Sequence, residues 1–170
     1  MKKLNQIDNS NPSILQDEKI IYAISAGVVL ILFGVVFTLA QPANLWDEVI
    51  DFFSSFTIAE VPGTSLIVLP SPITPSAHTI LYRAVFQFCL GLGIFQVLLL
   101  FLRLKIKSST KKIAETLASL IFWLGSSYLV IRFLNNSTSI NLWFIFWAGI
   151  LMILGLSFLA RGFVLYATRH

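Results

Sequence analysis

Two arginines stand inside otherwise apolar stretches of the chain, and they are the side chains best suited to chemistry. Arg83 falls on the same helical face as Gln87, and Arg132 lies one helical turn beyond Tyr128. A guanidinium group binds carboxylates and phosphates through paired, charge-assisted hydrogen bonds. A charge in an apolar segment is costly without a partner. We therefore expect these four residues to form a polar cluster that can hold an anion, with Glu60 as the counter-charge of Arg132.

A purely structural role explains the same residues, so two interpretations remain open. In the first, both arginines pair with acids such as Asp51 or Glu60, or extend to lipid phosphates. In the second, they bind an anionic ligand or a lipid head group. We expect Arg132 to face the interior of a helix bundle, because Ala118, Gly125 and Arg132 recur every seven residues.

Other groups that carry chemistry are scarce. His78 and His170 fall in segments that we assign to opposite sides of a membrane, so they cannot share a metal ion. Cys89 is the only cysteine, which excludes an intramolecular disulfide. The sequence has no Gly-rich phosphate loop, no Ser/His/Asp set, no paired carboxylates in apolar segments and no haem-spaced histidines. We therefore predict no catalytic, cofactor-binding or metal-binding residue.

The composition shows that the segments carrying these residues lie in a membrane. Of 170 residues, 56% are hydrophobic and 12% are charged, whereas about a quarter of the residues in soluble domains are charged. A chain this short cannot bury so much apolar surface in one water-facing core, so lipid must be its solvent. The basic residues that give the net charge of +4 flank apolar runs, which indicates membrane topology and no nucleic-acid partner.

We predict an all-α membrane protein in which a tail over residues 1–19 precedes one membrane domain over residues 20–170. Its four predicted spans are residues 20–40, 79–102, 113–134 and 142–160. The first span, about 31 Å long as a helix, matches the hydrocarbon thickness. A cleaved signal peptide is the alternative, but its apolar core would be only about 7–15 residues long.

The basic residues orient these spans in the cell membrane. The loop over residues 103–112 carries five Lys or Arg, and ten such residues lie on its side of the membrane. The loops on the opposite side have none. Because Lys and Arg are retained inside, both termini are predicted to be cytoplasmic.

The outer loop over residues 41–78 carries its own pattern. Residues 44–56 predict an amphipathic helix that lies at the outer membrane surface or docks on the mouth of the bundle. Its polar face is Asn44, Asp47, Glu48, Asp51 and Ser55, and its apolar face is Trp46, Val49, Ile50, Phe53 and Phe56. Pro62-Gly63 predicts a turn. The later prolines exclude a helix up to Ser76, and residues 66–69 are predicted to be a short extended segment or, alternatively, a shallow re-entrant dip.

Small residues seven positions apart occur in all four spans. They predict packing stripes in a left-handed four-helix bundle, because small side chains let membrane helices approach closely. The stripes are Gly27 and Gly34; Ala84 and Gly91; Ala118 and Gly125; and Ala148, Gly155 and Gly162.

Residues 112–133, KIAETLASLIFWLGSSYLVIRF, together with the preceding basic loop, give the chain a resemblance to a known group. This region is similar to small uncharacterised four-helix membrane proteins of archaea. The amphipathic segment after the first span also resembles the layout of oxidoreductase-associated membrane subunits of the DoxX type. The resemblance covers the whole chain without a functional motif, so it implies a four-helix fold and no activity.

Three functions are consistent with these features. We favour a non-catalytic membrane protein that associates with other membrane subunits or with itself. A small transporter or channel subunit is the first alternative, although no ionisable side chain lies in the middle of the spans, where ion pathways usually carry one. The second alternative is a membrane enzyme or a lipid- or anion-binding protein that uses the arginine cluster.

Overall fold

The structure is a computed structural model that describes residues 12–40, 42–64, 67–135 and 137–168. Four of its helices are long and apolar enough to cross a membrane: α1 (Pro12–Leu39), α3 (Thr79–Lys105), α4 (Thr110–Phe133) and α5 (Ile140–Ala167). The four predicted spans are thus confirmed as helices. The α1 helix begins at Pro12, within the segment predicted as a tail, and proline is well suited to the first position of a helix.

The helices also extend beyond the apolar runs that predicted them. The α3 helix continues to Lys105 and α5 to Ala167, while α4 begins at Thr110. Charged side chains end a membrane span but not a helix, and basic side chains in a last turn even complement the helix dipole. The predicted loop over residues 103–112 is therefore only a short turn between Lys105 and Thr110.

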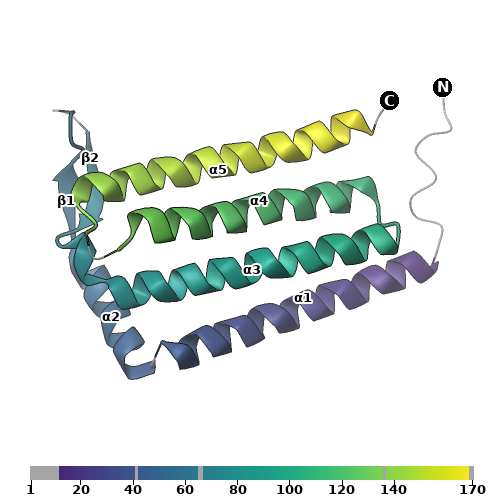
Figure 1. Ribbon diagram of the computed structural model, residues 1–170, viewed down its shortest axis with the longest axis horizontal. Helices are drawn as coiled ribbons and strands as arrows, with labels where there is room; N and C mark the ends of the chain where they lie inside the picture. Colours follow the sequence, from purple (N-terminus) through teal and green to yellow (C-terminus); the bar gives the residue numbers. More distant parts are fainter. Residues whose placement is uncertain (1–11, 41, 65–66, 136, 169–170) are drawn as a thin grey trace.

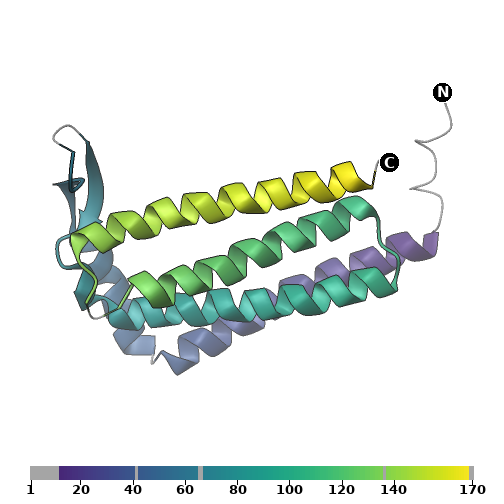
Figure 2. The same cartoon turned by 45° about the horizontal axis from the view of Figure 1, so that its top comes forward.

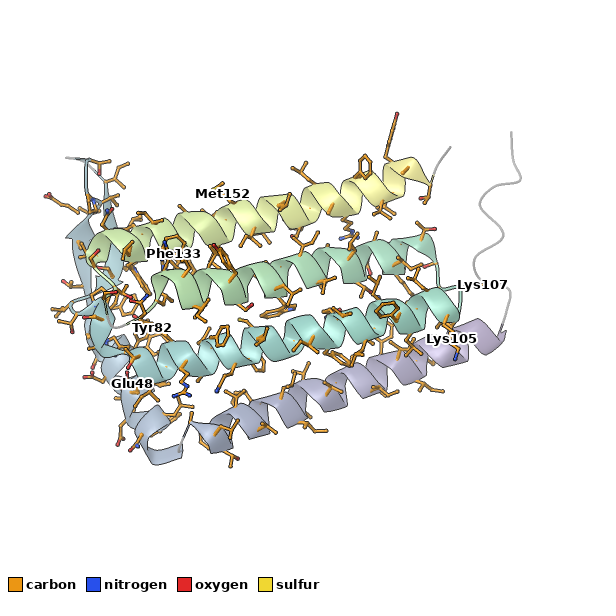
Figure 3. All side chains as sticks on the ribbon, in the orientation of Figure 1. Glu48, Tyr82, Lys105, Lys107, Phe133 and Met152 are labelled. Carbon is orange, nitrogen blue, oxygen red and sulfur yellow. The ribbon has the colours of Figure 1, made fainter. Side chains whose placement is uncertain are left out.

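The segment between α1 and α3 lies across one end of the long helices (Figure 1). It comprises α2 (Pro42–Ser54), the strands β1 (Phe56–Glu60) and β2 (Val68–Pro72), and the 3-10 helix η1 (Pro75–Ala77). We call this segment the cap, and the opposite end of the molecule, where α3 turns into α4, the loop end. Lys105 and Lys107 lie at the loop end (Figure 3).

The cap corrects the sequence prediction in two places. The predicted helix over residues 44–56 ends at Ser54, and Phe56 instead begins an antiparallel hairpin in which it pairs with Pro72. A 3-10 turn also begins at Pro75, where no helix was predicted; proline is acceptable there because the first N–H of a helix needs no partner. The predicted Pro62-Gly63 turn is present, with φ +85° at Gly63 and a hydrogen bond from Thr64 N to Val61 O (3.0 Å).

The long helices pack in the order α1, α3, α4, α5. Extensive contacts join α3 to α4 and α4 to α5, whereas α1 packs mainly on α3 and on α2. The two views show α1 and α5 on opposite sides of the α3–α4 pair (Figures 1 and 2). The expected bundle is therefore open: its first and last helices lie apart and each exposes a long apolar face.

The core is concentrated at the cap end. Aromatic side chains from three long helices and α2 meet there around Trp143, which is 3% exposed. Phe52 of α2 packs on Trp143 with a centroid distance of 6.0 Å, and Phe56 of β1 packs on it at 6.2 Å. This packing fixes the cap on the ends of the long helices.

Candidate functional site

The structure buries a histidine under the cap. His78 directly precedes α3, and its backbone carbonyl accepts a hydrogen bond from Tyr82 N (3.1 Å) in the first turn of that helix. The histidine is only 1% exposed. The polar face of α2 covers its imidazole with Glu48, Asp51 and Ser55. Two segments that are distant in sequence therefore meet at this one side chain.

The hydrogen bonds define where protons lie in this site. The Ser55 hydroxyl donates its hydrogen to Phe52 O (2.9 Å), so in its 3.3 Å contact with His78 Nε2 the imidazole must be the donor. The other ring nitrogen, Nδ1, lies 3.6 Å from Glu48 Oε1 and 4.0 Å from Asp51 Oδ2. Both distances are longer than a hydrogen bond.

Three buried polar atoms of this region have no hydrogen-bond partner among the described residues. They are Glu48 Oε1, His78 Nδ1 and Tyr82 OH. Glu48 and Tyr82 lie at the cap end of the molecule (Figure 3). Phe52 packs edge-on against both His78 and Tyr82, with centroid distances of 5.1 and 6.3 Å. We call His78, Glu48, Ser55 and Tyr82 the His78 site.

The His78 site offers hydrogen-bond donors and acceptors in a buried position. Across the described residues, no three His, Cys, Asp or Glu side chains come together in a way that could hold a metal ion. The sequence did not predict the site, because Asp51 was expected to pair with an arginine and His78 was considered only as a metal ligand. The i, i+3 and i+7 spacing of Glu48, Asp51 and Ser55 marks one face, but no local signal connects that face to a histidine at position 78.

The structure separates the five residues of the predicted anion cluster. Arg83 and Gln87 lie together on α3 and line a common hollow. Tyr128 and Arg132 are exposed on α4, and Glu60 is exposed on β1. Arg132 therefore points outward, opposite to the orientation that we expected, and no ion pair with Glu60 forms between the described residues. Anion binding by these residues stays a prediction.

The helical phase explains the outward orientation of Arg132. The buried face of α4 at this level carries Leu129 and Val130, which are 8% and 2% exposed. Arg132 follows Val130 by two positions and thus lies about 200° around the helix from it.

Some of the predicted packing stripes are filled by neighbours within the chain. A methyl group on Gly91 would lie 2.8 Å from Leu32 Cδ2 of α1, and one on Gly125 would lie 2.8 Å from Ile153 of α5. Ala84 is buried and Ala118 is half-buried. Two glycines outside the predicted stripes are also packed: Gly93 against Leu124 and Gly149 against Leu129.

The remaining stripe residues have no such neighbour. Gly27 and Gly34 on α1, and Gly155 and Gly162 on α5, have no side chain or distant backbone within 4 Å of where a methyl group would lie. Ala148 is exposed as well. The end helices of the array therefore expose the small residues that the inner helices bury.

Polar contacts also join the helices at the loop end. Arg103 is 7% exposed, and its Nη1 donates hydrogen bonds to Lys112 O (2.8 Å) and to Thr116 Oγ1. Arg161 of α5 forms an ion pair with Glu115 of α4 at 2.9 Å. The basic loop was interpreted only as a topology signal. Arg103 instead holds the α3–α4 turn.

The fold and its sites were compared with known proteins. No protein-family model, no curated protein and no solved structure matches this chain.

Proposed function

We propose that this chain is a non-catalytic membrane protein that self-associates through the exposed glycine face of α1. In this proposal the four long helices cross the cell membrane, the cap lies on the outer surface and both termini are cytoplasmic. The ten-to-none distribution of Lys and Arg supports that orientation. If α1 instead packs against a different membrane protein, the chain is an accessory subunit of that protein.

One observation carries the proposal, a hollow in the outward face of α1. The hollow measures about 360 Å³ and is lined by Ile31, Gly34, Val35, Thr38 and Leu39. Positions i, i+3, i+4 and i+7 of a helix surround the hole that accepts a side chain from a neighbouring helix. Ile31, Gly34, Val35 and Thr38 have this spacing, and Gly34 provides the floor. We call this feature the Gly34 hollow.

The weak packing of α1 within its own chain supports an external partner. Only 6% of its most apolar 18-residue window is buried, compared with 33% for α4. Apolar burial does not drive association in lipid, because lipid tails are as apolar as the side chains. Close packing at small residues supplies the stabilisation instead, and α1 presents two unfilled glycines, Gly27 and Gly34, one above the other.

The small residues of α5 offer a second surface for packing against another copy of the chain. Gly155 and Gly162 are as open as Gly27 and Gly34, and they lie on the helix at the other end of the array. One copy therefore has two separate surfaces on which a neighbouring copy can pack.

A photo-crosslinking amino acid at Thr38 tests the proposal in native membranes. Thr38 is exposed beside the Gly34 hollow, so irradiation should join two copies and double the apparent mass of the chain. Ala26 is the matched control, because it is exposed on α1 about 100° around the helix from Gly27. Equal yields of the doubled species from the two positions would contradict a specific α1 interface.

A further inference from the structure

Arg83 lies where the head groups of a membrane would be. The α3 helix has 27 residues, about 40 Å at helical rise, which exceeds the hydrocarbon thickness of about 30 Å. Arg83 and Arg103 are the first and last arginines of this helix, and the 19 residues between them carry no charge. The two arginines are therefore about 30 Å apart along the axis and mark the two hydrocarbon boundaries.

A hollow between α3 and α4 opens on one side of Arg83. It measures about 430 Å³ and we call it the first hollow. Its lining includes the apolar side chains Phe86, Val130, Ile131 and Leu134, together with the polar residues Thr79, Tyr82 and Asn135. An apolar wall next to a cation suits the acyl chain of a lipid whose head group is anionic.

A second hollow, between the α1–α2 junction and α3, opens on the other side of Arg83. It measures about 310 Å³ and has a more polar lining, in which Asn44 and Gln87 accompany the arginine. Gln87 lies one turn deeper than Arg83 on the same face, so its amide can donate a hydrogen bond to a group held by the guanidinium.

The electrostatics of the two hollows favour an anion. Of the described residues that line either hollow, Arg83 is the only charged one. The nearby acids Glu48 and Asp51 are instead directed towards His78. No hydrogen bond or ion pair of Arg83 forms within the described part of the chain, which leaves its guanidinium available to a phosphate group.

We propose that Arg83 binds the phosphate of an anionic phospholipid, with the polar head in the second hollow and an acyl chain in the first hollow. The site uses two residues of the cluster expected from the sequence, Arg83 and Gln87, and does not require Tyr128, Arg132 or Glu60. The second hollow and the Gly34 hollow share one lining residue, Leu39, and Arg83 lines only the lipid site.

Native mass spectrometry of the delipidated protein tests the site. Phosphatidylglycerol, phosphatidylcholine and inorganic phosphate are titrated separately, so that an anionic lipid is distinguished from any lipid and from a free anion. We expect phosphatidylglycerol to bind about tenfold more tightly than phosphatidylcholine, because the choline ammonium of phosphatidylcholine offsets the charge of its phosphate. Inorganic phosphate should neither bind nor compete at millimolar concentration.

Two exposed arginines provide a matched pair of variants. Arg83→Gln should remove the preference for phosphatidylglycerol, while Arg132→Gln, which removes the same charge from α4, should retain it. Ile131→Trp should fill the first hollow and weaken lipid binding without changing Arg83, and Arg83→Lys should keep part of the preference. The last two variants test the site even if Arg83→Gln does not fold.

Three results would overturn the proposal. The first is equal binding of the two lipids to the unmodified protein. The second is an equal loss of the preference in Arg83→Gln and Arg132→Gln. The third is competition by inorganic phosphate, which would assign the site to a free anion.

Discussion

His78 Nδ1 lies 3.6 Å from Glu48 Oε1, and this contact joins the cap to the first residues of α3. Both atoms are buried and neither has a hydrogen-bond partner among the described residues. On the other side of the ring, His78 Nε2 contacts the Ser55 hydroxyl at 3.3 Å. The His78 site thus attaches α2 to the start of α3.

The first prediction concerns this attachment. His78→Ala should lower the free energy of unfolding by about 2–4 kcal/mol, because it leaves a cavity and an unpaired Glu48. Glu48→Gln should retain most of the stability, since an amide N–H can donate to Nδ1 without an extra proton. Thermal unfolding in mild detergent measures both changes.

A double-mutant cycle separates the energy of the His78–Glu48 contact from the other effects of each substitution on stability. The effects of His78→Ala and Glu48→Ala should be non-additive, with a coupling of about 1 kcal/mol or more. Asp51→Asn is the control, because its side chain is 72% exposed and 4.0 Å away, and it should change stability by less than about 0.5 kcal/mol. Additive effects of the two alanine variants would show that the pair does not interact.

The second prediction concerns the α3–α4 turn. Arg103→Leu should destabilise the protein by about 2 kcal/mol, since Lys112 O and Thr116 Oγ1 lose a buried charged donor. Lys105→Leu removes the same charge from an exposed position in the same turn, so it should have little effect on melting. Equal losses in the two variants would mean that the charge, and not the hydrogen bonds of Arg103, matters.

The third prediction concerns orientation. In a Cys89→Ser background, single cysteines at Ser109 and Ser137 should react oppositely with a membrane-impermeant reagent applied to intact cells. Ser137, in the turn between α4 and α5, should react, and Ser109, in the turn between α3 and α4, should react only after lysis. The reverse pattern would place the cap in the cytoplasm and remove the basis for the proposed topology.

The sequence predicted the elements that depend on local patterns. Long apolar runs predicted all four long helices, and the two-faced pattern of residues 44–56 predicted α2 to within two residues of its end. These signals suffice because helix formation and burial against lipid or core are decided over a few turns. The Pro62-Gly63 turn was predicted for the same reason.

The parts that were not predicted depend on contacts between distant segments. The hairpin needs Phe56 to face Pro72, and the His78 site needs α2 to cover a residue 30 positions after Glu48. Neither pairing produces a periodic pattern in the sequence. The orientation of Arg132 was wrong because helical spacing shows which residues share a face, but not which face a neighbouring helix covers.

The central claim is that the Gly34 face of α1 is an association surface, and subunit counting in lipid nanodiscs tests it most directly. The purified chain should be present in assemblies of two or more copies, and Gly34→Leu should leave single copies, because leucine fills the Gly34 hollow. It should not harm the monomer, since no neighbouring side chain lies within 4 Å of an added methyl group and leucine favours the helix. The matched variant Ala26→Leu should assemble as the unmodified protein does. Single copies of the unmodified protein, or equal assembly of Gly34→Leu and Ala26→Leu, would contradict the proposed self-association.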